Sequence, residues 1–126
     1  MVKNSNISPH YKLGKDGEAY AQEYIKANGY RILHTNWFYN RKELDIVALK
    51  NSTLTVFEVK TRFYNSWEEP KDAVKMRKQR NIIDAADAYV QQYDLNFEVQ
   101  FDVISLTYNG KNYKLEHIPD AFTPTL

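Results

Sequence analysis

The chain has 126 residues and no cysteine, which excludes a disulfide scaffold, a thiolate zinc site and a thiol nucleophile. It has no apolar run long enough to cross a bilayer, and residues 1–9 lack the apolar centre of a signal peptide. It also has no glycine-rich phosphate loop and no serine nucleophile elbow. We therefore expect a soluble, cytoplasmic protein with no membrane partner.

A large charge of one sign is also missing, because the net charge is only +1. The whole-chain balance thus does not indicate a nucleic-acid partner, but the distribution of charge does. Residues 81–98 carry acids and no bases, whereas the bases gather just before them. The local basic patch consists of Lys71, Lys75, Arg77, Lys78 and Arg80.

Hydrophobic periodicity and turn residues predict the element order α-β-β-β-α-β-β, an α/β sandwich on a mixed sheet. Residues 1–14 are expected to form a flexible leader, and residues 15–126 a single domain. Asp16 is the expected N-cap of the first helix, Asn28-Gly29 its stop signal, and Asn109-Gly110 the last hairpin turn. The helices are predicted over residues 15–28 and 70–93, and the strands over 30–35, 44–49, 54–61, 99–107 and 113–118. Residues 36–41 form an aromatic-rich connection or a short strand.

The hairpin of residues 44–61 collects charged side chains on one face. If Asn51-Ser52 is its two-residue loop, antiparallel pairing places Asp45 opposite Glu58, and Glu43 opposite Lys60. All of these side chains share one face because strand side chains alternate with period two. Directly opposed Cβ atoms lie ~5 Å apart, close enough for two carboxylates to hold one cation.

This pattern favours phosphodiester chemistry. Asp45 and Glu58 should repel each other in apolar surroundings, and a divalent cation such as Mg²⁺ or Mn²⁺ would resolve the repulsion. Lys60 could orient a metal-bound water, help to take its proton, or stabilise charge on a phosphate. The ordinary alternative is a solvated strand face with a cross-strand ion pair.

Two helix features point toward the same site. Positions 71, 75, 78, 82, 85 and 89 form one stripe of the second helix, whose first half is lysine and whose second half is apolar. Either the lysine half overhangs a phosphate site, with Gln79 beside it, or these turns project past the sheet into water. Glu18, near the start of the first helix, is either a capping acid or a site residue.

The aromatic stretch of residues 36–40 has two interpretations. Its side chains could stack on exposed bases, or they could belong to the core, as aromatics this dense more often do. The three histidines match no metal-ligand spacing and are expected to have packing or surface roles.

The acids, in their order between two helices, resemble the YraN-like family of the PD-(D/E)XK nuclease superfamily, which is similar to archaeal Holliday junction resolvases. The resemblance spans about residues 14–103 and includes Glu43-Leu44-Asp45, Glu58-Val59-Lys60-Thr61-Arg62 and Phe101-Asp102-Val103. Lys42 and Gln100 depart from it, standing where the family usually has glycine and arginine. The resemblance implies a restriction-endonuclease-like three-layer fold, with helices on the faces of a mixed sheet.

The resemblance also implies roles for single residues. Asp45 and Glu58 would bind Mg²⁺ or Mn²⁺, Lys60 would be the catalytic lysine, and Glu18 an additional catalytic acid. Lys75, Lys78 and Gln79 would face the nucleic acid, and the lysine stripe of the second helix adds Lys71 to them. Glu43 would support the site, and Asp102 could organise it from a neighbouring strand.

Three functions compete at this point. The leading hypothesis is a metal-dependent nuclease that acts on DNA, with branched or damaged structures as candidate substrates and a homodimer as the implied assembly. The second is a non-catalytic nucleic-acid-binding module on the same fold. The third is a protein-interaction domain that uses exposed aromatics.

Overall fold

The computed structural model describes residues 9–64 and 74–124 and confirms the predicted element order. The elements are α1 (Pro9–Ala27), β1 (Arg31–Tyr39), β2 (Lys42–Lys50), β3 (Thr53–Phe63), α2 (Met76–Gln92), β4 (Glu98–Tyr108) and β5 (Tyr113–Phe122). Neither α1 nor α2 combines the length and the apolar character needed to cross a bilayer.

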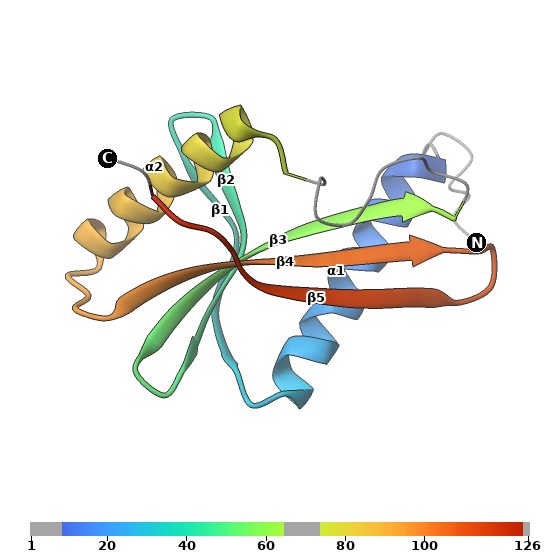
Figure 1. Cartoon of the computed structure of the whole chain (residues 1–126), viewed down its shortest axis with the longest axis horizontal. Coiled ribbons are helices and arrows are strands. Elements are labelled where there is room, and N and C mark those ends of the chain that lie inside the picture. Colours follow the sequence, from blue (N-terminus) through green and yellow to red (C-terminus); the bar gives the residue numbers. More distant parts are fainter. Residues whose placement is uncertain (1–8, 65–73, 125–126) are drawn as a thin grey trace, which may run out of the picture.

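The five strands form one open sheet in the order β1-β2-β3-β4-β5 (Figure 1). Neighbouring strands are antiparallel except β3 and β4, which run parallel. A parallel pair needs a crossover between its strands, and α2 lies in this connection. The mixed sheet expected from the sequence is therefore confirmed.

The two helices pack on opposite faces of the sheet, which gives three layers (Figure 1). Alternate strand residues enter different cores: Val56 joins the α2 side, and Phe57 joins the α1 side. The α2-side core also contains Ile82, Ala85, Ala86, Tyr89, Leu44, Val47, Leu54, Phe101 and Val103. The α1-side core contains Ala21, Ile25, Ile46, Ala48, Ile104 and Leu106.

The start of α1 corrects the predicted leader. The helix begins at Pro9 rather than at residue 15, so residues 9–14 are helical and Asp16 lies inside the helix instead of capping it. Proline is tolerated in the first turn of a helix, and an internal Gly14 costs only ~1 kcal/mol. Leu13, buried against the rest of the domain, gives the added turn a packing contact. Residues 1–8 lie outside the described part of the chain.

The end of α1 agrees with the sequence prediction. The backbone N–H of Gly29 donates to the Lys26 carbonyl, and that of Tyr30 donates to the Ile25 carbonyl. Gly29 has a φ of +89°, the left-handed conformation that this helix ending requires. The chain leaves α1 in a fixed direction and enters β1.

Two other boundaries differ from the prediction. The aromatic connection is part of one continuous strand, β1, because Trp37, Phe38 and Tyr39 pair with β2. Helix α2 begins at Met76, after Lys75, and not at residue 70. Pro70 and Lys71 lie outside the described residues. The apolar half of the predicted stripe is confirmed, since Ile82, Ala85 and Tyr89 are buried.

Helix α1 approaches β3 closely at Gly17. A Cβ atom built on Gly17 would overlap Oγ1 of Thr61 and lie 3.0 Å from its Cγ2. Thr61 is branched at Cβ, so its side chain has little freedom to move away. The absence of a side chain at position 17 therefore lets α1 lie against β3, next to Glu18 and Lys60.

We expect Gly17→Ala to destabilise the protein although alanine favours helices. Overpacking costs about 1–3 kcal/mol, against a helix-propensity gain of about 1 kcal/mol. Gly14→Ala is the matched control: no atom lies within 4 Å of its added Cβ, so it should gain up to about 1 kcal/mol. Urea unfolding measures both, and equal stabilisation by the two variants would contradict the close approach. Adding Thr61→Ala to Gly17→Ala should restore part of the loss.

Candidate active site

The site lies where the sheet divides. The β2–β3 ladder runs from Lys50↔Thr53 to Ile46↔Phe57 and stops there. Beyond that point β2 continues along β1, and β3 continues along β4. Figure 1 shows the β1–β2 hairpin diverging from the β3–β4–β5 arm. Asp45 and Glu58 are the first residues past the last pair, so they occupy the fork between the two arms.

Asp45 takes over a hydrogen bond that the ladder no longer makes. Its Oδ2 accepts the backbone N–H of Val59 at 2.8 Å. A buried strand N–H without a partner would be costly, so the carboxyl stabilises the fork as well as occupying it. The predicted register is thus confirmed from Ile46 to Lys50, whereas the expected direct pairings of Asp45 with Glu58 and of Glu43 with Lys60 lie beyond the ladder.

Both acids of the fork are removed from water. Asp45 is 7% exposed, and the Glu58 side chain is 12% exposed. Burial, followed by the neighbouring Glu58 carboxyl, raises the pKa of Asp45 well above its ordinary value. Burial likewise raises the pKa of Glu58. A hydrogen bond between the two carboxyls raises the pKa of Asp45 further and opposes the upward shift at Glu58. The alternative of a solvated strand face is therefore wrong for this pair.

Two lysines approach Glu58. Nζ of Lys78, on α2, lies 3.7 Å from Oε2 of Glu58. Lys60 follows Glu58 by two positions on β3 and is half-buried. The ammonium groups of Lys78 and, to a smaller extent, Lys60 oppose the upward shift in the pKa of Glu58. The acid pair is therefore flanked by cations on one side.

Asn36 joins two further acids to the site. Its Nδ2 donates to Oε1 of Glu18 at 3.2 Å and to Oε2 of Glu43 at 2.8 Å. Glu18 adds to the upward shift in the pKa of Asp45, and Glu43 acts in the same way on Glu58. Acids from α1, β2 and β3 therefore gather at the fork.

Asn36 itself was missed as a site residue, because its sequence neighbours suggested an aromatic stretch. Its φ of +50° lies in the left-handed region, which asparagine tolerates better than most residues. An asparagine between β-forming residues is the signal that could have identified it. This conformation interrupts the regular alternation of β1 and directs the amide toward both acids.

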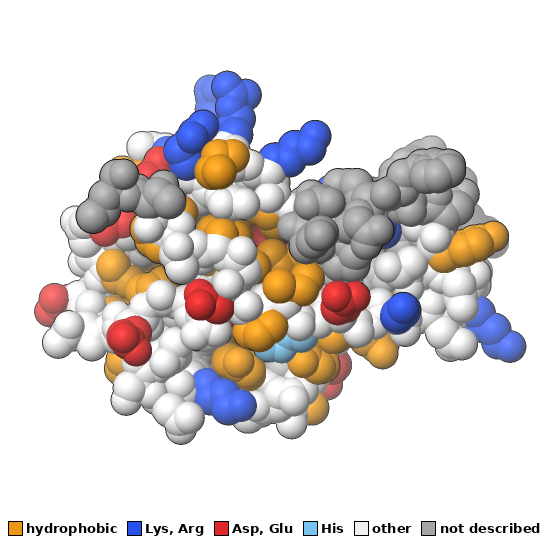
Figure 2. Space-filling model, viewed as in Figure 1, with side chains coloured by type: hydrophobic (Ala, Val, Ile, Leu, Met, Phe, Trp, Pro, Cys, Tyr) orange, Lys and Arg blue, Asp and Glu red, His pale blue; other side chains and the backbone are white. Residues whose placement is uncertain are grey.

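Two further residues that were predicted to face the nucleic acid lie near the start of α2. Lys75 precedes α2 and is exposed, and Gln79 donates from Nε2 to the Val74 carbonyl at 3.1 Å. Gln79 therefore closes the first turn of α2, and its described hydrogen bond does not reach the acids. Figure 2 shows Lys and Arg side chains gathered over the start of α2 and the turn of the β1–β2 hairpin.

Comparison with known sequences gives the family of the chain. Residues 17–106 match the model described as "Uncharacterised protein family UPF0102". The chain is 43% identical to a UPF0102 protein of Parabacteroides distasonis, over 87% of this chain and 91% of the relative. It is 39% identical to a UPF0102 protein of Bacteroides thetaiotaomicron, over 95% and 99% of the two chains. The chain belongs to the UPF0102 family. The matched region contains Glu18, Asn36, Asp45, Glu58 and Lys60.

Asp102 has a structural role in this UPF0102 protein. It is fully buried on β4 and hydrogen-bonds to His117 at 2.7 Å, Gln100 at 3.0 Å and the backbone N–H of Asp120 at 3.0 Å. These bonds outweigh the effect of burial and lower the pKa of Asp102. They tie β5 to β4 where the β4–β5 register shifts. Asp102 therefore secures the sheet edge.

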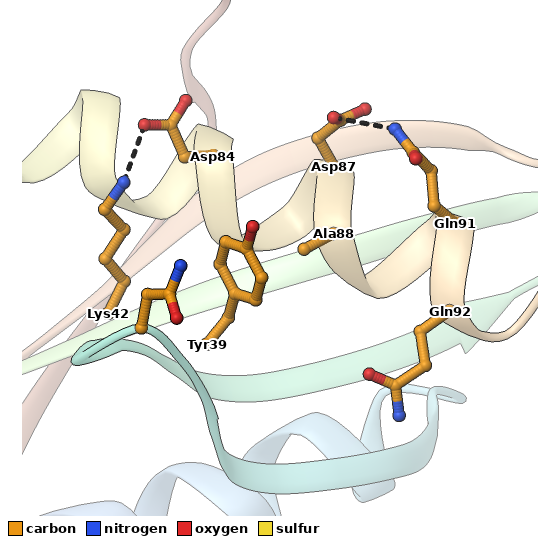
Figure 3. A pocket seen from close by; sticks show the side chains of 8 residues that line it. Tyr39, Lys42, Asp84, Asp87, Ala88, Gln91 and Gln92 are labelled. Carbon is orange, nitrogen blue, oxygen red and sulfur yellow. Dashed lines mark hydrogen bonds and ion pairs between the residues drawn. The ribbon is translucent and has the colours of Figure 1, made fainter.

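Lys42 is paired with an acid of α2. Its Nζ lies 2.9 Å from Oδ2 of Asp84 on α2, at a polar cavity of about 510 Å³ (Figure 3). Tyr39, which pairs with Lys42, lines the same cavity. Lys42 thus fastens the β1–β2 turn to α2.

Proposed function

We propose that this UPF0102 protein is a nuclease that uses Mg²⁺ or Mn²⁺ to hydrolyse phosphodiester bonds in DNA, with branched or damaged DNA as its substrate class. The observation that carries the proposal is the buried pair Asp45 and Glu58 at the fork. Two desolvated carboxyls in contact are unfavourable without a cation or a proton between them. The resemblance to the PD-(D/E)XK superfamily supports the same assignment of these residues.

The donor chemistry of the fork suits a divalent cation. Among residues 9–64 and 74–124, no three acid or histidine side chains are arranged to enclose one ion. Mg²⁺ does not require such a cage, because it binds through one or two carboxylates and retains waters and substrate phosphates. Asp45 and Glu58 would hold the ion. When bound, it would polarise the phosphoryl oxygens and lower the pKa of a bound water.

The chain supplies the other functions itself. Lys60, beside Glu58, would orient the attacking water, accept its proton or stabilise charge on the phosphate. Glu18 and Glu43, held by Asn36, keep the negative potential of the fork high. Because bare carboxylates repel phosphate, this concentration of acids favours a cation-loaded site over one that binds DNA unaided.

The direct test is a calorimetric titration of Mg²⁺ or Mn²⁺ into the wild-type chain, with cleavage assays on linear, nicked and four-way-junction DNA. We expect metal binding and metal-dependent cleavage. Absence of both, together with salt-sensitive DNA affinity that ignores divalent ions, would replace the nuclease with a non-catalytic nucleic-acid-binding module.

Either of these functions predicts phosphate contacts near the start of α2. Lys75 and Lys78 are exposed there, and each neutralised phosphate releases counterions. We expect the double variant Lys75→Ala, Lys78→Ala to reduce the slope of log K against log salt by about 2. Fluorescence anisotropy of a labelled duplex between about 50 and 200 mM salt measures this slope.

The matched control is Lys111→Ala, Lys114→Ala. It removes the same charge from exposed positions at the β4–β5 hairpin. Its salt slope should equal that of the wild type. Equal reductions in the two double variants would show that phosphate contacts are not concentrated at α2.

A further inference from the structure

The turn between β1 and β2 is tight and fixed in place. Tyr39 pairs with Lys42, and the two residues between them, Asn40 and Arg41, have φ values of +46° and +67°. Two successive left-handed residues make the hairpin turn that matches strand twist, although arginine is unusual there. The Lys42–Asp84 ion pair holds this turn against α2.

The two faces of the hairpin differ in what they contact. Tyr39 and Lys42 point toward α2 (Figure 3), and the Trp37 ring packs on Tyr89 of α2 with centroids 5.1 Å apart. Because strand side chains alternate, Phe38 and its cross-strand partner Glu43 lie on the opposite face. Of the three consecutive aromatics, Trp37 joins the core, Tyr39 lines the polar cavity, and Phe38 is 62% exposed.

Phe38 is also next to the candidate active site. It stands directly opposite Glu43, so their Cβ atoms lie ~5 Å apart. Glu43 bonds to Asn36, which also bonds to Glu18. Single exposed apolar residues are common, so the position of Phe38 beside the acids carries more weight than its exposure.

The charge of Glu43 and the aromatic ring of Phe38 indicate which kind of ligand this surface binds. Glu43 repels a phosphate, whereas the face of a base is uncharged and stacks on an aromatic ring. A base within an intact duplex has both faces covered by its neighbours, so only an unpaired or unstacked base can reach Phe38. The side chain of Arg41, at the turn, is exposed, and a guanidinium group binds phosphate.

We propose that Phe38 stacks on an unpaired base of the bound nucleic acid, so that the protein selects bulges, branch points or single-stranded ends over continuous duplex. This inference rests on the nucleic-acid partner of the proposed function. It assigns Phe38 as the residue that determines specificity and Arg41 as its phosphate contact.

The test uses two oligonucleotide duplexes that differ only in one unpaired 2-aminopurine, whose fluorescence is quenched by stacking. Quenching and affinity are measured after rapid mixing with Mg²⁺ for wild type, Phe38→Ala and Phe38→Trp. Phe97→Ala is the matched control, because Phe97 is also an exposed phenylalanine but precedes β4. We expect Phe38→Ala to lose the quenching and about 10-fold in affinity for the bulged duplex only. Phe38→Trp and Phe97→Ala should behave as wild type.

Cleavage of the same two duplexes separates this inference from the nuclease. Equal cleavage of both duplexes, unchanged in Phe38→Ala, would overturn the role of Phe38 and retain the nuclease. Quenching that depends on Phe38 without any cleavage would retain the base contact and overturn the nuclease. Absence of binding and cleavage would overturn both. A Phe38→Ala variant that changes only self-association would assign Phe38 to a protein contact and overturn the inference.

Discussion

Asp45→Asn is expected to lose metal binding and at least about 100-fold in DNA cleavage while remaining folded. The amide is nearly isosteric with the carboxyl. Its oxygen can still accept the Val59 N–H, and its nitrogen can donate a hydrogen bond to Glu58. What disappears is the negative charge that a divalent cation requires. Calorimetric titration and the junction-cleavage assay measure the two losses.

The same variant should be more stable than wild type in metal-free solution at neutral pH. Burial, with Glu58, raises the pKa of Asp45 above its unfolded value of about 3.9. Between these two pKa values the folded state binds more protons than the unfolded state, so wild-type stability falls as pH rises through that window. The substituted amide has no proton to lose. The stability difference should therefore shrink as pH falls toward the unfolded pKa, which urea unfolding at several pH values would show.

The control for this variant is Asp87→Asn, which removes an exposed carboxylate of α2 that bonds to Gln91. It should retain cleavage and metal binding and should gain no stability at neutral pH. An Asp45→Asn protein that still cleaved DNA with Mg²⁺ would remove Asp45 from the metal site. One that lost stability at neutral pH would contradict the unfavourable acid pair.

Lys60→Ala is expected to separate chemistry from metal binding. Loss of a group that orients water, transfers a proton or stabilises charge in the transition state lowers the cleavage rate by about 10²–10⁴-fold. Metal affinity should persist or increase, since an ammonium group beside Glu58 opposes cation binding. This pattern differs from that of Asp45→Asn, which loses both properties.

The matched control for the lysine is Lys114→Ala, which removes an exposed ammonium group of β5. It should cleave DNA as wild type does. Normal cleavage by Lys60→Ala would refute the assigned mechanism even if metal binding required Asp45. Loss of metal binding in Lys60→Ala would instead indicate that the lysine holds the structure of the fork.

Local patterns in the sequence determined much of the secondary structure and strand register of this protein. Period-two alternation and the Asn51-Ser52 turn set the register in which Leu49 pairs with Leu54. Helical spacing correctly predicted the buried face of α2, and Asn28-Gly29 correctly predicted the end of α1. Each of these features depends on residues close together in the chain, so it can be predicted from the local sequence.

Only the tertiary structure decided how the acids meet. The β2–β3 ladder ends at Ile46, whereas β2 keeps its pairing with β1 and β3 keeps its pairing with β4 beyond that point. No single segment of the sequence shows where the two strand pairs diverge. The fork is what buries Asp45, gives it the Val59 N–H and leaves it beside Glu58. A strict continuation of the hairpin would have placed both acids on an ordinary strand face.

Contacts between distant elements decided the roles of the other residues. Asn36 is a linker because α1 and β2 both bring an acid to it, and Asp102 is structural because β5 returns His117 and Asp120 to β4. The sequence by itself determined which acids and lysines were available and on which strands and helices they lie. The packing of α1 and the division of the sheet determined which of them share one desolvated space, because burial and charge coupling depend on all the neighbours at once.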